Sequence, residues 1–299
     1  MYLINFILNV AGLLIWLSWR ASRFDPVATA RPSTLAGTLR RAESRPVKRW
    51  HMPVALACLL VLRSHFYWQM GSSMNWSASL NVAAISVSFA SFGPGAFLRM
   101  LLFSILSFAA TLGVFLLWML FLSLLCRPSA ELNLVRRFVR LHIGRVDDWP
   151  GPLKALLPLL SVGILWWLLT WPLVHWDLLP QPTSIAHRTE QSLIIGLASY
   201  LAWKHIIVGV LALHLLNSYV YLGSHPFWKN ISLVARRLLW PLHRLPMSIG
   251  KLDLSPALVI VLVLAVTQCV ENGVNLPPWS NSPSFKLPGL VDLYRYVAT

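Results

Sequence analysis

The chain has 299 residues, of which 57% are hydrophobic and 12% charged, and its mean hydropathy is +0.63. Soluble domains carry about 25% charged residues, so this composition excludes an ordinary soluble domain and favours a protein of the lipid bilayer. The formal net charge is +15. Most of the Lys and Arg residues lie in three short loops between apolar segments. We therefore interpret the excess as the positive-inside pattern and expect no nucleic-acid partner.

Six apolar segments approach or exceed the roughly 20 helical residues that a bilayer-spanning helix needs. They lie at residues 2–19, 52–70, 96–126, 156–175, 192–222 and 256–274. We predict an all-α membrane protein with about six transmembrane helices in three repeated hairpins, at 1–70, 96–176 and 192–275. The first segment lacks a basic leader and a small-residue cleavage site, so we expect it to be retained as a span.

Charge asymmetry predicts the topology. The basic loops at 20–51, 127–154 and 229–251 hold most of the 25 Lys and Arg residues and are expected to face the cytoplasm. Both termini then lie outside a bacterial inner membrane, together with an outer loop at 177–191. The Pro- and Ser-rich tail at 276–299 is expected to form an irregular outer arm.

The second segment contains Arg63 and His65. An arginine at mid-bilayer costs about 2.5–3.5 kcal/mol on insertion scales. Because both residues lie toward the outer end of the segment, we expect their side chains to snorkel to the interface. A buried ion pair inside the helix bundle is the alternative.

An insert at 71–95 carries no charged residue. Within it, Ile85 to Phe89 alternates apolar and small polar residues, which is the period of a β-strand. The region around Asn75, Trp76 and Asn81 could supply a partner strand. We therefore predict a small extracytoplasmic β-hairpin or flap.

The third and fifth segments are longer than a bilayer requires, so they are expected either to tilt strongly or to project outward. This places Lys204 and His205 at the outer edge of the fifth span. The fourth span ends in an aromatic belt that is typical of a membrane interface, made of Trp166, Trp167, Trp171 and Trp176.

Residues 132–160 and 231–262 share one pattern: a short basic helix, a turn, and the start of an apolar helix. On a helical wheel, the arginines of the first copy cluster on one side and its apolar residues on the other. Such a helix is expected to lie in the inner-leaflet headgroups, with arginine facing lipid phosphate. Packing against protein is the alternative. The candidate interfacial residues are Arg136, Arg137, Phe138, Arg140, Arg236, Arg237 and Trp240.

The turn after each basic helix also repeats, as GRVDDWP from residue 144 and GKLDLSP from residue 250. Glycine permits the turn, Asp or Ser can cap the next helix, and Pro suits its first turn. The aspartates could instead bind a proton or a cation, but helix capping explains them without a ligand. The candidate turn and cap residues are Gly144, Asp147, Asp148, Pro150, Gly250, Asp253, Ser255 and Pro256.

The run NISLVARRLLWPLHRLPMSIGKLDLSPALVIVLVL, at 230–264, resembles the signature of the YggT/YlmG family of small integral membrane proteins. The helix before it, with Ser218-Tyr219-Val220-Tyr221, supports the resemblance. The middle hairpin matches weakly, with Trp149 in place of the serine. The third hairpin and the uncharged insert depart from the usual two-hairpin pattern. The resemblance implies a protein that is not an enzyme and that is linked to cell-envelope and division processes, osmotic tolerance, or plastid cytochrome b maturation and nucleoid organisation.

The chain contains no HExxH, P-loop or GxSxG motif and no clustered carboxylate pair. The three cysteines, Cys58, Cys126 and Cys269, lie far apart and are expected to be inert. We therefore expect no enzyme, no metal and no cofactor, but a scaffold or assembly factor. Its expected partners are anionic inner-leaflet lipids and other integral membrane proteins or further copies of itself.

Two other functions remain open. A small-solute or ion transporter or channel would use intramembrane polar groups, for which His214 and Gln268 are the best candidates. Haem handling would need paired ligands. His205 and His214 are about 13 Å apart along one predicted helix, so they cannot both bind one iron from that helix.

Overall fold

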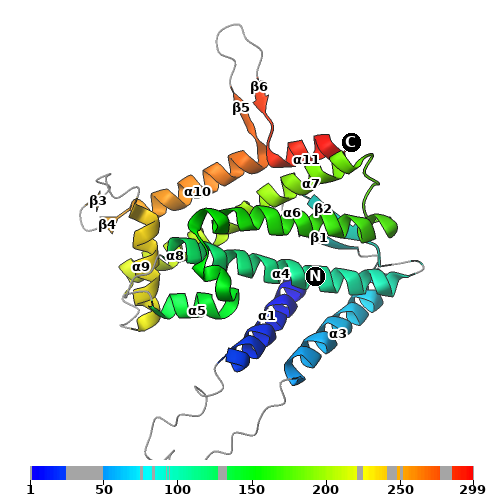
Figure 1. The fold of residues 1–299 in the computed structure, drawn as a ribbon, viewed down its shortest axis with the longest axis horizontal. Helices are drawn as coiled ribbons and strands as arrows, with labels where there is room; N and C mark the ends of the chain where they lie inside the picture. The colour runs from blue at the N-terminus through cyan, green and yellow to red at the C-terminus, as the bar shows by residue number, and fades with distance from the viewer. Residues whose placement is uncertain are drawn as a thin grey trace, which may run out of the picture. The chain divides into compact units, whose positions relative to one another are not determined.

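The computed structural model describes residues 2–24, 50–74, 77–82, 85–91, 93, 95–126, 133–220, 225–240, 248–249, 252–276 and 285–298. Helices dominate these residues (Figure 1). They are α1 (Tyr2–Phe24), α3 (His51–Met74), α4 (Ala96–Leu125), α5 (Asn133–Ile143), α6 (Gly151–His175), α7 (Ile185–Ala198), α8 (Trp203–Tyr219), α9 (Pro226–Leu239), α10 (Ser255–Asn272) and α11 (Leu290–Ala298). Two 3-10 helices, η3 (Gly144–Asp148) and η4 (Ser199–Ala202), connect α5 to α6 and α7 to α8.

Within the described residues, five helices are long and apolar enough to cross a membrane. They are Tyr2–Ala21, Ala96–Leu125, Gly151–His175, Ile185–Tyr219 and Ser255–Asn272. The predicted apolar, helical architecture is therefore confirmed. The second predicted span forms α3, which has the necessary length. Its C-terminal half carries Arg63 and His65, which make it too polar to qualify, so the count of six spans stays a prediction.

Three two-stranded sheets accompany the helices in the described ranges. The first pairs β1 (Ala78–Val82) with β2 (Ile85–Phe89), which confirms the small hairpin predicted in the uncharged insert. Val87 and Phe89 are buried while Ser86 and Ser88 are exposed, as the alternating sequence requires. The predicted strand at 85–89 therefore has the predicted bounds.

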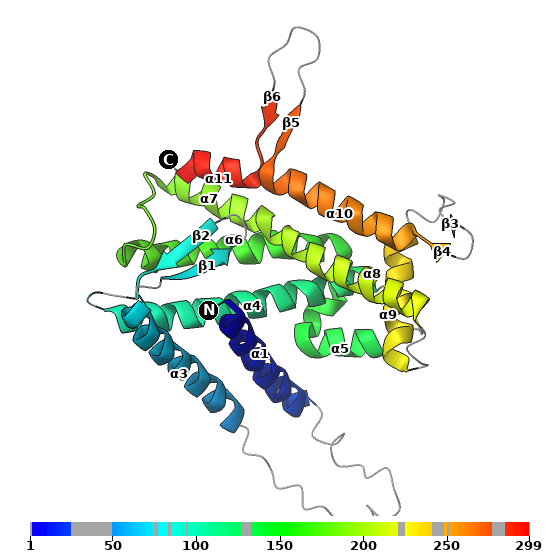
Figure 2. The ribbon, with the colours of Figure 1, turned by 180° about the vertical axis from the view of Figure 1, so that it is seen from behind.

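The C-terminal tail is more ordered than the expected irregular arm. β5 (Val274–Leu276) pairs antiparallel with β6 (Phe285–Leu287), and α11 follows (Figure 2). Two glycines close the base of this hairpin: a Cβ on Gly273 would lie 2.2 Å from the carbonyl oxygen of Leu287, and one on Gly289 would lie 2.3 Å from the nitrogen of Gly273. Only residues without a side chain fit there. The expectation of an irregular arm was therefore wrong for the described part of the tail.

The chain forms two compact units. Unit 1 comprises Met1–Leu80 and Ser88–Phe115, so it contains α1, α3 and the first part of α4. Its large hydrophobic side chains that are fully buried are mostly aromatic: Tyr67, Phe89, Met100 and Phe103. In this unit α1 packs against α3.

Unit 2 comprises Asn81–Val87 and Leu116–Thr299. Within it, α6 packs along α7 and α8 packs along α10. A core of Leu211, Ala235, Leu239 and Val259 joins α8, α9 and α10. The fifth predicted span is divided, since η4 separates α7 from α8. The whole Ile185–Tyr219 segment has 35 residues.

Small residues set the distance between α6 and α7. A Cβ on Gly196 of α7 would lie 2.6 Å from the carbonyl oxygen of Leu159 in α6, and one on Gly163 of α6 would lie 3.2 Å from the carbonyl oxygen of Ser192. Membrane helices commonly approach one another closely through such small residues. The α6–α7 hairpin therefore depends on glycine at the point of closest approach.

We predict that Gly196→Ala destabilises the protein by about 1–3 kcal/mol, because a backbone atom would have to move to admit the methyl group. Gly209→Ala in α8 is the matched control, since a Cβ there meets nothing within 4 Å. Thermal unfolding in detergent measures both variants. Equal unfolding temperatures would contradict close packing of α6 on α7.

Candidate functional site

The candidate site is the elbow formed by α5, η3 and α6, where the chain turns from the first basic helix into an apolar one. Gly144 begins the turn with a φ of +66°, a left-handed conformation that glycine adopts without strain. This confirms the role expected of Gly144. The turn that begins the elbow therefore follows from the glycine at position 144.

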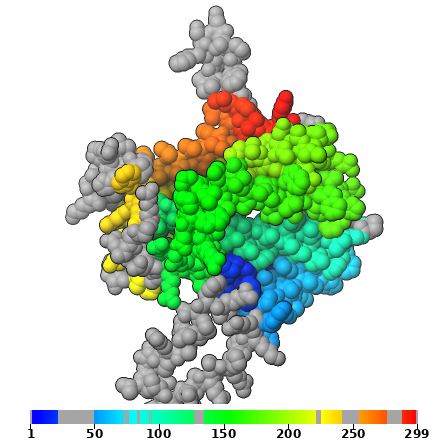
Figure 3. Space-filling model, in the orientation of Figure 1, coloured from blue at the N-terminus to red at the C-terminus, as the bar shows by residue number. Residues whose placement is uncertain are grey.

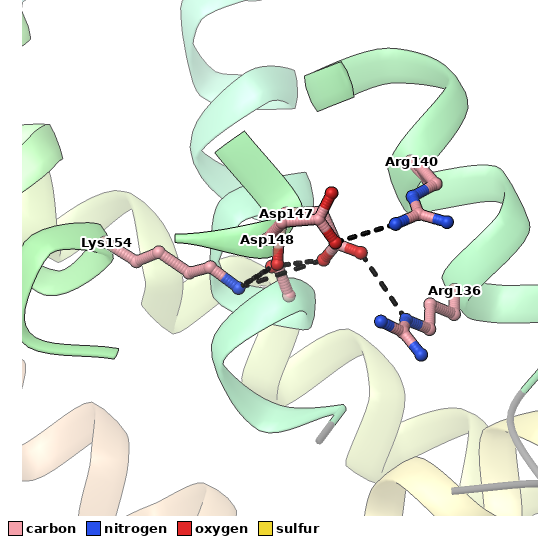
Figure 4. A network of polar contacts seen from close by, with 6 residues as sticks. Arg136, Arg140, Asp147, Asp148 and Lys154 are labelled. Atoms are coloured by element: carbon pink, nitrogen blue, oxygen red, sulfur yellow. Dashed lines mark hydrogen bonds and ion pairs between the residues drawn. The ribbon is translucent and has the colours of Figure 1, made fainter. Parts of the chain in front are cut away.

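Asp147 lies at the centre of the elbow and is buried, with 8% of its surface exposed. One of its carboxylate oxygens, Oδ1, accepts a hydrogen bond of 2.6 Å from the Ser123 hydroxyl of α4. The other, Oδ2, accepts from Nε of Arg136 at 3.5 Å (Figure 4). A buried carboxylate requires such partners, because its desolvation is otherwise very unfavourable.

Lys154, in the first turns of α6, closes the network from the opposite side (Figure 4). Its ammonium group donates to the Asp147 backbone carbonyl at 2.5 Å and to the Ser123 hydroxyl at 2.9 Å. The Lys154 nitrogen also lies 3.9 Å from Oδ1 of Asp147. One buried ion pair and a shared hydroxyl thus join α4, η3 and α6.

A second pair, between Arg140 and Asp148, lies on the surface of the elbow. Its N···O distance is 2.7 Å, but both side chains are more than half exposed. Exposed pairs contribute about 0–1 kcal/mol because water and salt compete with them. This pair therefore orients α5 only weakly compared with the buried Asp147 network.

The aspartates do not have the helix-capping role that the sequence suggested. The N-cap of α6 is Pro150 and no side chain makes a capping hydrogen bond, since Asp147 is used by the ion-pair network. At the second copy of the turn, the N-cap of α10 is Leu254, again without a side-chain cap, and Pro256 lies in the first turn as expected. Gly250 and the side chain of Asp253 lie outside the described residues.

The two copies of the turn also have different structures. The first is the 3-10 helix η3, whereas residues around the second form a short ladder between β3 (Ser248–Ile249) and β4 (Leu252–Asp253). The similar sequences therefore do not produce the same backbone.

The two basic helices nevertheless meet within unit 2, at the end of α4. Cys126 and Val234 of α9 form a buried cluster with Val135 of α5 packed against it. Arg237 of α9 donates a 3.0 Å hydrogen bond to the carbonyl of Leu125, where the helix dipole of α4 favours a cation.

The predicted interfacial residues therefore divide into two groups. Arg136 and Arg140 bind carboxylates and Arg237 binds a backbone carbonyl, so these three stabilise the protein itself. The second group is Arg137, Phe138, Arg236 and Trp240, which are exposed, as Arg140 also is, and Trp240 has 78% of its surface exposed. Lipid contact by this second group stays a prediction.

Arg63 contradicts the snorkelling expectation, because it is only 2% exposed inside unit 1. Its guanidinium donates to Oδ1 of Asn9 at 2.6 Å and to Oδ1 of Asn5. It also lies 5.4 Å from the ring centre of Tyr67 and 5.7 Å from that of Phe103.

Arg63 does not form the buried ion pair that was the alternative expectation either. The described residues of unit 1 include no Asp or Glu. Nε of Arg63 has no hydrogen-bond partner in the described part of the chain. The charge is thus held by amide oxygens and aromatic rings. The unusual pair of asparagines in the first apolar segment, Asn5 and Asn9, was the sequence signal for this site.

Lys204 forms an ion pair with Glu271, which joins the start of α8 to the end of α10. The expectation of Lys204 at an outer edge did not include this partner. Of the two residues considered for transport, His214 is partly buried in α8 and Gln268 is exposed on α10. In the described ranges, no group of three or more His, Cys, Asp or Glu side chains could hold a metal ion.

Comparisons with protein-family models, with curated proteins and with solved structures found no match to this chain. The fold itself defines a helical protein in which, among the described residues, five helices are long and apolar enough to cross a membrane.

We predict that Lys154→Met destabilises the protein by up to about 3–5 kcal/mol, because it leaves the buried Asp147 carboxylate short of a partner. Arg140→Met removes the exposed pair and is expected to cost at most about 1 kcal/mol. Chemical denaturation in detergent measures both variants.

The double variant Asp147→Asn/Lys154→Met provides a further control. It should recover part of the lost stability, because neither charge then remains buried alone. A Lys154→Met variant as stable as Arg140→Met would show that the buried network does not hold the elbow.

Proposed function

We propose that this chain is a non-enzymatic, multi-pass protein of the bacterial inner membrane that acts as a scaffold or assembly factor. The observation that carries this proposal is a difference in the chemistry of inner and outer side chains. Charged groups are bound inside each unit, whereas long apolar faces remain exposed on the candidate membrane helices.

The inner charges make contacts that fix the fold. Asp147 and Lys154 join α4 to the elbow, Lys204 and Glu271 join α8 to α10, and Arg63 joins α3 to α1. These groups are held by other side chains of the same unit. They suit a rigid structure that presents surfaces.

The outer faces offer those surfaces. On α10, Val261 is 65% exposed and Val266 53%, and on α6, Ile164 is 59% and Leu168 55% exposed. In a membrane such faces meet lipid or the helices of other proteins, because either contact satisfies them equally well. The resemblance of residues 230–264 to the YggT/YlmG signature supports the same proposal.

The test is photo-crosslinking in intact membranes, with a photo-reactive amino acid at Val261 on the exposed face of α10. We predict discrete crosslinked products that contain a second protein or a second copy of this chain. The same amino acid at Val259, which is 6% exposed, is the matched control and should give none. Crosslinks from Val261 to lipid alone would contradict the proposal.

A second candidate, an anion transporter or channel, is favoured by Arg63. A buried cation without a carboxylate partner attracts anions, and ionisable residues within membrane segments frequently mark ion pathways. In unit 1 the described residues supply only neutral ligands to this charge.

We predict for this candidate that purified protein in proteoliposomes conducts chloride and that Arg63→Gln abolishes the flux. The amide of glutamine can still bind Asn9, so the variant removes mainly the charge. Arg99→Gln, at the start of α4 in the same unit, is the control and should retain the flux. A rate equal to that of empty liposomes would exclude chloride transport.

A further inference from the structure

A cavity of about 310 Å³ lies where α6 ends and α7 begins. Its walls carry both signs of charge, since Arg188 and Asp177 line it together. Thr170, Trp171, His175 and Gln181 also line it. No contact described so far for the elbow or for Arg63 involves this cavity.

Arg188 is held in a fixed orientation. Its Nε donates a 2.7 Å hydrogen bond to the Thr170 hydroxyl, and one terminal nitrogen donates to the backbone carbonyl of Trp167. The guanidinium lies 4.2 Å from the ring centre of Trp167. A guanidinium has five N–H donors, so the remaining ones are available for a ligand, and all its present partners are neutral. Arg188 therefore presents an uncompensated positive charge.

Asp177 supplies the opposite charge from an unusual backbone position. Its φ is +53°, the only positive φ of a non-glycine residue in the described part of the chain. Asp and Asn tolerate this conformation better than most residues. The structure gives the Asp177 carboxylate no ion-pair partner among the described residues, although Arg188 lines the same cavity.

The position along α6 places this cavity at the depth of lipid headgroups. Between Lys154 and His175 the helix carries no charged residue. That interval spans about 32 Å at 1.5 Å per residue, close to the roughly 30 Å of bilayer hydrocarbon. Trp171, which is 74% exposed, stacks on His175 at this end. Figure 3 shows α6, in green, on the surface of its unit.

We propose that this cavity binds the zwitterionic headgroup of an ethanolamine phospholipid. The phosphate binds the free N–H donors of Arg188, with Gln181 beside it, and the ammonium group binds the Asp177 carboxylate. Charge complementarity selects this occupant: a purely anionic headgroup would meet Asp177 with a like charge. The inference rests on α6 crossing the membrane and is independent of the scaffold proposal.

The test uses the full chain, purified in mild detergent and offered phosphatidylethanolamine, phosphatidylcholine or phosphatidylglycerol with identical acyl chains. Native mass spectrometry measures which lipid remains bound. We expect about tenfold stronger retention of phosphatidylethanolamine than of phosphatidylglycerol, because one charge-assisted hydrogen bond is gained and one repulsion avoided. The trimethylated choline headgroup has no N–H donor and should fall between the two.

Asp177→Asn provides the decisive variant, because asparagine keeps the left-handed backbone and removes the negative charge. It should reduce the preference for phosphatidylethanolamine over phosphatidylglycerol to within about twofold. Glu190→Gln makes the same chemical change on the exposed surface of α7, outside the cavity, and should leave the preference unchanged.

Three results would overturn the proposal. They are equal retention of the three lipids by the unchanged protein, an Asp177→Asn variant with the original preference, and displacement of the lipid by soluble phosphoethanolamine at an equal concentration. The last result would identify a free phosphoamine, not a lipid, as the occupant.

Discussion

The buried carboxylate of Asp147 is the constraint on which the second unit depends. It lies where α4 ends, where α5 turns and where α6 begins, and each of these segments contributes a partner. A buried ion pair contributes little net stability compared with apolar packing, but removing one partner is very unfavourable. In the arrangement that the structure describes, each of the three segments supplies a partner, so a shift of any one of them would leave a charge short of a partner.

Three further charges are satisfied by different means, and of these only Arg63 is buried. Lys204 meets a carboxylate, Arg188 meets a hydroxyl, a carbonyl and an aromatic face, and Arg63 meets two asparagines and two rings. Pairing with neutral ligands leaves a net positive charge in place, whereas pairing with Asp or Glu cancels it. Arg188 and Arg63, which have neutral partners, are thus the groups from which ligand binding can be argued most directly. Lys204, which meets a carboxylate, holds the fold.

How far the sequence predicted the structure depended on the range of the interactions. The β-hairpin at 78–89 followed from alternation within five residues, and the helical segments from their apolar length. The burial of Arg63 was not predicted, because its partners Asn5 and Asn9 come from another helix and nothing in the sequence next to Arg63 marks them as its neighbours. For the same reason the sequence predicted a helix cap at Asp147. Its partner Ser123 is distant in the sequence, and Arg136 lies in the helix on the other side of the turn.

The two glycines at the base of the β5–β6 hairpin make α10 and α11 almost consecutive in space, because Gly273 and Gly289 touch through their backbones. The paired strands β5 and β6 thus leave and rejoin the two helices at a single point. A hairpin of this kind can change in length or content without altering the helices, since both its ends stay fixed. The hairpin is accordingly the natural place to insert an epitope or a fluorescent domain, and a position at which a new binding segment could be acquired without disturbing the helices.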